Sequence, residues 1–431
     1  MALPFKHIPD ICPAYLVGGT VRDMLLSRAP TDYDIAVAGN PEDFARNLAA
    51  ANKGRVVVLG KPGLLLFRVV IPGHLVDITG LNGDCIEADL GERDFTINAM
   101  AIDLADGNMI DLFNVRRDIE RRIVRMVSPT AFLKDPVRLI RAFRMAAAFS
   151  FAISRETARA IATHAGRIRT SAAERIRDEL FKILECDPSV SIVRQMEEIG
   201  LLEEMFPELY SFRKPLRLPF DAYGNLEQIL HAPESRFPQW ASEIRRDVGK
   251  TERGLLKCAC LFQDVGAMNN APEGSSSTRE SNAQAAVADG IASRLKFSNH
   301  RKLFIDTVIR YAPLTRRLCR SELTRREHMR FYTRFDAFVP AMMLLESSMN
   351  EIPDAVIDGQ FQEFYGYYRA TAGMPRLISG RDLIRDLGLD PSPAFKLILS
   401  MVEEERLLGN LTTREEALEF IKQWLADDED G

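Results

Sequence analysis

Long apolar runs are missing from this chain of 431 residues. None reaches the roughly 20 consecutive apolar residues that a transmembrane helix needs. The segment from Met1 to Ile11 also lacks the basic flank and the long apolar stretch of a secretory signal peptide. We therefore expect a cytoplasmic protein with no membrane partner.

Cysteine is also scarce, with six residues scattered through the chain. Disulfide-stabilised proteins are usually short and dense in cysteine, so we expect free thiols. Cys258 and Cys260 form a close pair without a partner cluster, in the segment GLLKCACLF. That segment is typical of a buried helix, and we interpret both as core residues rather than metal ligands.

Composition is otherwise that of a soluble globular protein, with 46% hydrophobic and 27% charged residues. The length predicts about two to four domains. The net charge of -5 conceals an uneven distribution, because residues 115–182 contain 16 Lys or Arg against 7 Asp or Glu. Such a basic segment indicates either a phosphate-binding surface or a solvated helical surface.

Hydrophobic patterning divides the chain into two kinds of structure. Runs rich in Val, Ile and Leu predict strands between residues 14 and 114, at AYLVGG, DYDIAVA, RVVVLG, LLLFRVVI and HLVDIT. VRDMLL and PEDFARNLAAA predict helices between them, and from about Ile119 onward the pattern is helical. Breaks are expected at 186–188, 206–207, 214–219, 269–282 and 372–375, and one long amphipathic helix is expected to end the chain.

A glycine turn and an acidic strand carry the first functional signal. Gly18, Gly19 and Arg22 follow a predicted strand and open a helix, where free N–H groups and a positive charge would cradle a triphosphate. Asp32 and Asp34 alternate along one predicted strand and so project to the same side. Paired carboxylates suit the divalent cations that nucleotidyl transfer uses.

Further polar residues follow in the same part of the chain. Asp77, in LVDIT, ends a later predicted strand and would complete the acidic set. Arg93 and Asp94, in RDFTINAMA, stand beside apolar residues and are expected to be held in place, to contact phosphate and a ribose hydroxyl. An ordinary internal ion pair is the alternative. Asn98 lies in the same segment.

The segment KDPVRLIRAFR predicts a helix with Asp135 as its N-cap and Pro136 in its first turn. Arg138, Arg141 and Arg144 recur every three residues and form a basic face opposite an apolar packing face. Arg and Asp side chains pair with base edges in nucleic-acid recognition. Spacing alone fits a solvated helix face equally well.

The order VGGTVRD, DYDIA, RDFTINAMA, DPVRLIRAFR and ERIRDEL resembles the class II tRNA nucleotidyltransferase and bacterial poly(A) polymerase family. The resemblance covers essentially the whole chain. It implies an α+β fold, with an N-terminal nucleotidyltransferase-fold α/β head (1–118) and an all-α neck that binds the nucleotide base and RNA (119–186). A helical body (187–372) and a helical tail that binds tRNA (373–431) follow.

The same resemblance implies an enzyme that adds C and/or A residues from CTP or ATP to the 3′ acceptor end of tRNA, with Mg²⁺, and releases pyrophosphate. Asp32 and Asp34 match its metal-binding carboxylates, and Asp77 matches its third acidic position. Asp135 and Arg138 match the pair that reads the incoming base. The positions expected to contact the nucleotide are Gly18, Gly19, Arg22, Arg93, Asp94, Asn98, Asp135, Arg138, Arg141 and Arg144.

Two departures from the family pattern bear on the subtype. Lys134 stands where the family usually has an acidic residue, next to the base-reading Asp135. Only 15 residues, Ile78 to Glu92, separate Asp77 from Arg93, and this shortening resembles CC-adding enzymes. The alternatives are an A-adding enzyme or poly(A) polymerase, and a non-catalytic RNA-binding protein on the same scaffold.

A third departure concerns the body. KCACLFQDVGAMN resembles the LLHDIGK stretch of members with a metal-dependent phosphohydrolase domain, but Gln263 replaces the histidine ligand. Asp264 remains, whereas SSSTRES and VIRYAP stand where further histidines are expected. An amide in place of an imidazole binds metal poorly. The sequence therefore predicts a structural remnant without phosphodiesterase activity.

Overall fold

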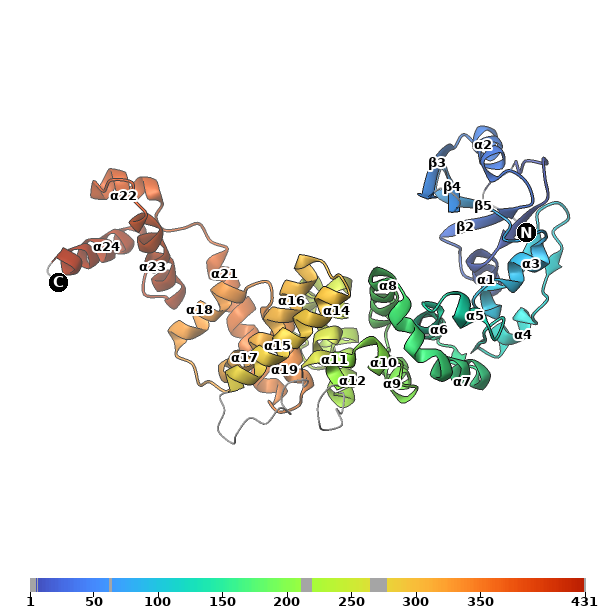
Figure 1. The fold of residues 1–431 in the computed structure, drawn as a ribbon. Coiled ribbons are helices and arrows are strands. Elements are labelled where there is room, and N and C mark those ends of the chain that lie inside the picture. The colour runs from blue at the N-terminus through green and yellow to red at the C-terminus, as the bar shows by residue number, and fades with distance from the viewer. Residues whose placement is uncertain (1–4, 6, 62–63, 211–218, 264–276, 430–431) are drawn as a thin grey trace. The chain divides into compact units, whose positions relative to one another are not determined.

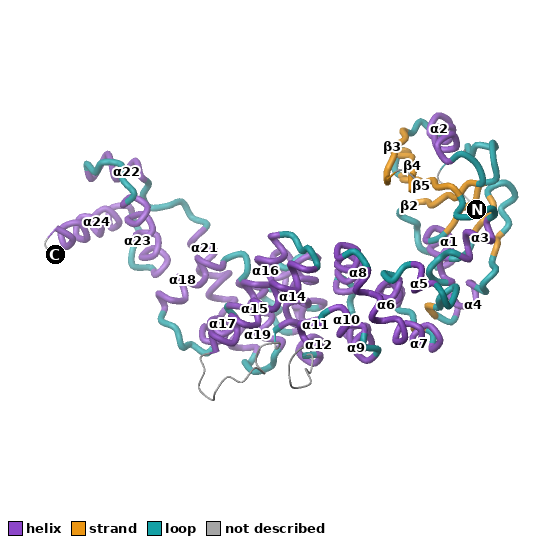
Figure 2. Tube along the Cα trace, in the orientation of Figure 1, coloured by secondary structure: helices purple, strands orange, loops and turns teal. Residues whose placement is uncertain are grey.

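The computed structural model describes residues 5, 7–61, 64–210, 219–263 and 277–429. The chain divides into two compact units, Met1–Pro207 and Glu208–Gly431 (Figure 1). The first unit begins with a β-sheet and continues with helices, and in the second unit every described element is a helix (Figure 2). The predicted α+β fold class, a sheet-containing head followed by helices, is confirmed.

A seven-stranded mixed sheet forms the start of the first unit, in the order β3-β4-β5-β2-β1-β6-β7. Its strands are β1 (Ala14–Val17), β2 (Asp32–Val37), β3 (Arg55–Lys61), β4 (Leu64–Ile71), β5 (His74–Gly80), β6 (Ala101–Asp103) and β7 (Met109–Ile110). The five predicted strands are therefore present. The patterning missed β6 and β7, because two or three residues are too few to show an alternation.

The only parallel pair in this sheet is β2 with β5, and all other neighbours are antiparallel. The register sets Asp34 of β2 directly opposite Asp77 of β5. Helix α2 (Pro41–Ala51) packs on β3, β4 and β5, with Phe44 and Leu48 fully buried. Helix α1 (Gly19–Leu25) follows β1 immediately, so the glycine turn lies beside the acidic strand.

Short helices and longer ones complete the first unit. They are α3 (Ile86–Gly91), α4 (Val115–Glu120), α5 (Ala131–Lys134), α6 (Arg138–Phe149), α7 (Arg155–His164), α8 (Ala173–Leu184), α9 (Val190–Glu198) and α10 (Leu201–Met205), with 3-10 turns at Thr96–Asn98 and Ala165–Thr170. A two-residue parallel pair, β8 (Ile123–Val124) with β9 (Ala152–Ile153), interrupts the region that was predicted to be wholly helical.

The start of α6 differs from the prediction. Asp135 is not its N-cap: it lies in an extended conformation at the end of α5, and α6 begins at Arg138. The Asp135 carboxylate accepts a hydrogen bond of 3.3 Å from the N–H of Val137, and two more from Arg175 of α8, a partner that no local pattern reveals. The apolar packing face of α6 is confirmed, because Leu139, Phe143 and Ala146 are buried.

The second unit is built from helices. They are α11 (Pro207–Tyr210, which begins one residue before the unit), α12 (Phe220–His231), α13 (Ala241–Asp247), α14 (Lys250–Phe262), α15 (Ser277–Arg294), α16 (Asn299–Arg310), α17 (Ala312–Cys319), α18 (Arg325–Phe335), α19 (Val339–Ser348), α20 (Asp354–Phe361), α21 (Arg369–Ala372), α22 (Gly380–Leu387), α23 (Ala394–Leu408) and α24 (Arg414–Glu429), with a 3-10 turn at Pro233–Ser235 and a π-helix at Gln362–Tyr368.

Two sequence expectations are corrected here. The predicted loop at 269–282 is partly helical, because 277–282 belong to α15, while 264–276 lie outside the described residues, as do 214–218. The single terminal helix is two helices, α23 and α24, separated at Gly409, whose positive φ of 81° ends α23.

The cysteine predictions are confirmed. Cys258 and Cys260 are buried in α14, and all six cysteines are free thiols. Of the helices that the structure describes, none combines the length and the apolar character that a membrane crossing demands.

Candidate functional site

A cavity of about 460 Å³ lies in the first unit, where the glycine turn, the acidic strand β2, the segment 92–98 and helix α6 meet. It is lined by Gly18, Gly19, Arg22, Asp34, Asn82, Asp89, Glu92, Arg93, Asp94, Asn98, Asp135, Arg138, Arg141, Arg144 and Met145. Eleven of the thirteen predicted site residues are among these. Asp32 and Asp77 are not in the lining.

Two acidic side chains face each other across the parallel strands. Asp34 lies opposite Asp77, and burial together with the nearby charges of Asp77 and Asp32 raises the pKa of Asp34 to about 6, although Arg93 and Arg22 act in the opposite direction. Burial and the neighbouring carboxylates thus make the ionised form of Asp34 unfavourable, and Arg93 and Arg22 only partly offset this. A bound cation would relieve that repulsion.

Asp77 is already paired inside the protein. Its two carboxylate oxygens each accept a hydrogen bond of 2.7 Å from the Arg68 guanidinium of β4. Among the described residues, no three His, Cys, Asp or Glu side chains are grouped as they would be around a metal ion. This pairing leaves Asp32 and Asp34 as the carboxylates that remain for a cation, which fits a divalent ion completed by substrate phosphates and water.

The glycine turn leaves room beside these carboxylates. Gly18 has a positive φ of 67°, and a Cβ at this position would lie 2.8 Å from Nη1 of Arg93 and 3.7 Å from Oδ2 of Asp34. The positive φ therefore favours glycine here, and a side chain would also displace the Arg93 guanidinium. Arg22, one turn into α1, donates to Oδ1 of Asn98 at 2.6 Å.

Thr20 is a site residue that the sequence interpretation missed. Its hydroxyl accepts a hydrogen bond of 2.8 Å from the backbone N–H of Asp34 and donates one of 3.2 Å to the carbonyl of Asp32. The side chain is 1% exposed. It therefore ties the start of α1 to the strand that carries both carboxylates. A threonine in the first turn of a helix was the available signal, but its partner was not visible in the sequence.

The segment from Arg93 to Asn98 is held by internal contacts. The guanidinium of Arg93 is bonded to Asp89 of α3, with Nη2 and Oδ2 2.7 Å apart. Asp94 accepts hydrogen bonds from the N–H of Phe95 and the side-chain amide of Asn98, and forms an ion pair of 2.7 Å with Arg141. Asp94 therefore lines the cavity and forms an internal ion pair at the same time.

The cavity-facing side of α6 is likewise fixed by its neighbours. Arg138 donates to the carbonyls of Glu92 at 2.8 Å and Arg93 at 3.3 Å. Arg144 pairs with Glu179 of α8 at 2.5 Å. Arg138, Arg141 and Arg144 all line the cavity, so the predicted basic face of α6 lies at the site rather than in open solvent.

Asp135 lies at the rim of the same cavity. Burial acts to raise its pKa, but two hydrogen bonds from Arg175, of 3.0 and 2.7 Å, and the nearby charge of Arg138 hold it below its ordinary value. The carboxylate is thus ionised and accepts hydrogen bonds at neutral pH.

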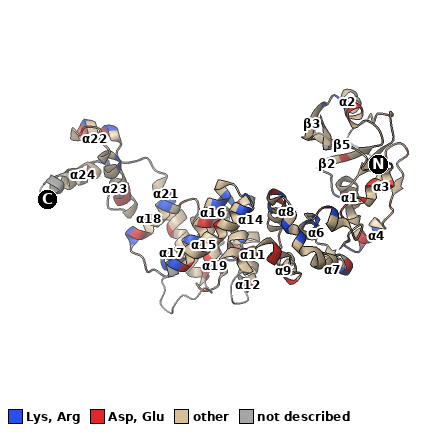
Figure 3. Cartoon of the chain, in the orientation of Figure 1, with Lys and Arg blue, Asp and Glu red and all other residues tan. Residues whose placement is uncertain are grey.

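Beyond the cavity, the basic segment presents free cations. Many of its Lys and Arg side chains form internal ion pairs, but a subset is exposed and has no carboxylate partner in the described part of the chain. Figure 3 shows how Lys and Arg are distributed along the helices of this segment. This subset is Arg116, Arg117, Arg121, Arg122, Arg155, Arg159 and Arg167. Exposed, unpaired arginines are suited to contact the phosphates of a nucleic acid.

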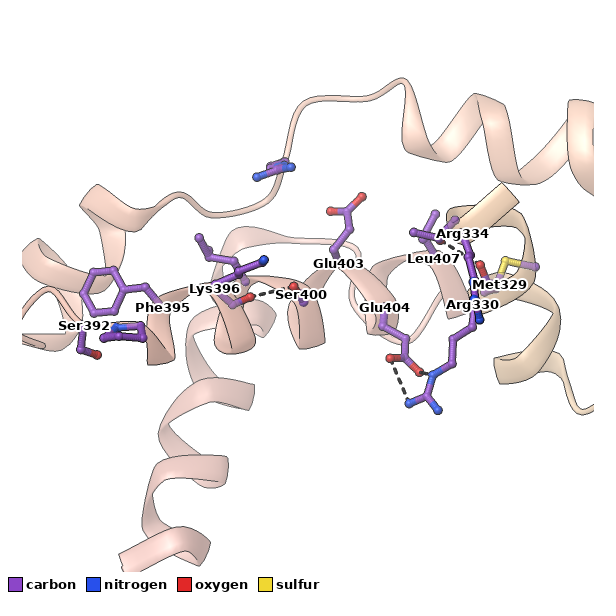
Figure 4. A pocket seen from close by; sticks show the side chains of 14 residues that line it. Met329, Arg330, Arg334, Ser392, Phe395, Lys396, Ser400, Glu403, Glu404 and Leu407 are labelled. Atoms are coloured by element: carbon purple, nitrogen blue, oxygen red, sulfur yellow. Dashed lines mark hydrogen bonds and ion pairs between the residues drawn. The ribbon is translucent and has the colours of Figure 1, made fainter. Parts of the chain in front are cut away.

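A larger cavity, of about 790 Å³, lies in the second unit between α18 and α23 (Figure 4). It is more apolar, with Met329, Phe395 and Leu407 in its wall. Its two acidic residues, Glu403 and Glu404, are paired with Arg406 and Arg330. Because both carboxylates are paired with arginines and the wall contains no glycine turn, we place the chemistry at the smaller cavity.

The phosphohydrolase-like segment is described only in part. Gln263 is buried at the end of α14, and Asp264 lies outside the described residues. VIRYAP spans the junction of α16 and α17 and supplies no histidine. The predicted loss of phosphodiesterase activity stays a prediction.

Two family models match the first unit. The head-domain model of poly(A) polymerase matches residues 14–79 and 76–125, and a model described as a probable RNA and SrmB-binding site of polymerase A matches residues 150–212. The first covers the sheet and the cavity residues up to Asn98. The second covers α7 and α8, which carry Arg155, Arg159 and Arg175.

Three curated relatives resemble this chain in sequence, and each is named for the addition of nucleotides to tRNA or for CCA. A CC-adding tRNA nucleotidyltransferase of Geobacter sulfurreducens is 36% identical over 59% of this chain and 60% of its own length. An A-adding tRNA nucleotidyltransferase of Deinococcus radiodurans is 29% identical over 97% and 98% of the two chains. A multifunctional CCA protein of Herminiimonas arsenicoxydans is 32% identical over 75% and 78%.

The solved structures agree on the fold. A CCA-adding enzyme of Thermotoga maritima, solved with tRNA, is 24% identical, covers 96% of this chain and 91% of its own, and superposes with a TM-score of 0.70. The order of motifs, the mixed sheet with its helical extension, and the identity to relatives over three quarters of the chain lead to one conclusion. The chain is a nucleotidyltransferase that belongs to the class II tRNA nucleotidyltransferase and poly(A) polymerase family.

Proposed function

We propose that this enzyme adds nucleotides to the 3′ end of tRNA without a nucleic-acid template, with CTP and/or ATP as substrate and Mg²⁺ as metal, and releases pyrophosphate. The observation that carries the proposal is the convergence, in one cavity, of Asp34 of the acidic strand, a glycine turn and a basic helix face. These are the parts that a nucleoside triphosphate and a divalent cation require.

The proposed chemistry is attack of the RNA 3′ hydroxyl on the α-phosphate, which forms the new O–P bond as the bond to pyrophosphate breaks. A divalent cation, when bound, supplies positive charge at the reacting phosphate. Asp32 and Asp34 would supply its carboxylate oxygens. Arg22 and Arg93 would offset the charge of the triphosphate, and the bare backbone at Gly18 would let that triphosphate approach.

The base of the nucleotide would lie at α6. Arg138 and Asp135 offer donors and acceptors on the same side of the cavity, and both are fixed by bonds to other elements. Protein side chains held in this way would select the base as a template does, by hydrogen-bond pattern. Asp94 would orient the ribose, with Arg141 and Asn98 holding its carboxylate.

For the subtype we propose CC addition. The connection between Asp77 and Arg93 is short and contains α3, and Asp89 ties it together by accepting from the N–H of Asn82 at 3.0 Å and from Arg93. Because this segment is fixed, the cavity has little freedom to change its shape from one that accepts C to one that accepts A. A-adding activity is the second candidate, because a full-length relative is named for it.

The decisive experiment supplies each labelled nucleoside triphosphate with Mg²⁺ and tRNA truncated at successive 3′ positions. Arrest after two C residues supports the proposal, whereas A addition to tRNA that ends in CC would make this an A-adding enzyme. Long A tails on unrelated RNA would indicate a poly(A) polymerase, and RNA binding without incorporation a non-catalytic protein.

Asp32→Ala tests the assignment of the chemistry. We expect incorporation to fall to background while circular dichroism shows a folded protein, because a cation would lose one of its two carboxylates. Near-normal incorporation by this variant would exclude the acidic strand as the metal site.

A further inference from the structure

Lys134 precedes the proposed base-contacting Asp135, and the structure gives it a definite partner. Its ammonium group lies 2.6 and 2.7 Å from the two carboxylate oxygens of Glu92. Lys134 is the last residue of α5, and Glu92, which lines the cavity, follows α3, so this ion pair connects α5 to the cavity wall. The two side chains are 44% and 41% exposed.

Residue 92 is held a second time, through its backbone. Its carbonyl accepts the 2.8 Å hydrogen bond from Arg138, which also reaches the carbonyl of Arg93. Lys134 therefore binds this short segment through the side chain of Glu92, and Arg138 binds it through the main-chain carbonyls of Glu92 and Arg93. Any shift of residue 92 moves the guanidinium of Arg138.

The segment gripped in this way also carries the sugar and phosphate contacts of the proposed site. Arg93 points to the glycine turn beside Asp34, and Asp94 is paired with Arg141. The distance between the base-contacting group and the phosphate-contacting group is therefore set at residues 92–93. A carboxylate at position 134 would face Glu92 and push that segment away from α6.

We propose that Lys134 and Glu92 are positioning residues that determine base selectivity, by fixing Arg138 relative to Arg93. This inference rests on the proposed function. The positive charge at position 134 is matched to the carboxylate of Glu92 in this chain.

A charge exchange tests the pair. The variants are Lys134→Glu, Glu92→Lys and the double variant, with Lys53→Glu, an exposed lysine between α2 and β3, as the control for net charge. The affinities for CTP and ATP are measured by titration without RNA, so that no turnover occurs, and the rates of C and A incorporation are measured with tRNA.

We expect each single variant to change the ratio of the two affinities, and the matching ratio of kcat/KM, by roughly two- to fivefold, as suits a partly exposed ion pair. The double variant should return towards the wild-type ratio, and Lys53→Glu should leave it unchanged. The thermal midpoint reports folding separately, so a merely structural effect would lower it without changing the ratio.

The failures are distinguishable. If the wild type binds neither nucleotide and extends no tRNA, the proposed function is wrong. If the wild type is active and both single variants keep its ratio, or the double variant stays as altered as the single ones, the pairing does not set selectivity and the inference is overturned while the function stands.

Discussion

Asp34→Asn should make the protein more stable while it removes the activity. Asparagine keeps the shape of the side chain but carries no charge, so the repulsion with Asp77 and Asp32 disappears. The pKa of Asp34 rises from its ordinary 3.8 to about 6 on folding, because of burial and these neighbours. That difference means that the ionised carboxylate of Asp34 lowers the free energy of unfolding by roughly 3 kcal/mol, at about 1.36 kcal/mol per pKa unit.

The stability that Asp34→Asn gains over the wild type should increase with pH. Between about pH 4 and pH 6 the native carboxyl binds a proton that the unfolded chain has already lost, so the wild type loses stability as pH rises through this window. The variant does not titrate there. The difference between the two should therefore be small near pH 4, grow up to about pH 6 and stay constant above it.

The assay is thermal unfolding of both proteins from about pH 4 to pH 8 in buffer with a chelator. For a unit of about 200 residues, roughly 3 kcal/mol corresponds to a rise in Tm of about 6–12 °C. Asp10→Asn, at an exposed carboxylate, is the matched control and should change little. Adding Mg²⁺ should raise the Tm of the wild type but not of Asp34→Asn, because only the former keeps both carboxylates.

Two results would refute this reasoning. One is an equal Tm for wild type and variant at pH 7 without metal. The other is a difference that is as large at pH 4 as at pH 7, because such a gain would not come from the ionisation of Asp34.

The remaining predictions concern Thr20 and the exposed arginines of α7. Thr20→Val should lower the free energy of unfolding by about 1–3 kcal/mol and lower kcat at saturating nucleotide, because the N–H of Asp34 loses its partner. Thr20→Ser should keep the wild-type stability and kcat. A fully active Thr20→Val would contradict this role. The double variant Arg155→Ala, Arg159→Ala should weaken RNA binding and reduce the slope of log affinity against log salt by about 2. The affinity for CTP should not change. An unaltered slope would show that the RNA binds elsewhere.

Local patterns predicted most of the fold, because they report on single elements. The strand with Asp32 and Asp34 and the basic face of α6 follow from side-chain periodicity, and both are present. The short strands β6 and β7 and the break between α23 and α24 were missed. Strand β6 depends on pairing with β1, β7 depends on pairing with β6, and the break depends on a left-handed glycine, none of which periodicity reports.

The contacts that fix the candidate site were not predictable in the same way. Arg68 meets Asp77 only because β4 and β5 pair in one register, and Arg175 meets Asp135 across 40 residues of sequence. A single sequence gives the residue types but not these distances. The N-cap assigned to Asp135 was wrong because α6 begins later, at Arg138, although the Asp135 carboxylate still accepts a hydrogen bond from the N–H of Val137.

The parallel pairing of β2 and β5 restricts where this protein tolerates a change in length. Because side chains alternate between the faces of a sheet, one residue inserted between His74 and Asp77 would turn Asp77 to the opposite face and bring an aliphatic neighbour against Asp34. An insertion after Gly80 falls beyond the last paired residue and leaves both carboxylates in place. Natural length variation in such chains should therefore collect directly downstream of β5, where a deletion or an insertion alters the cavity wall without disturbing the acidic strand.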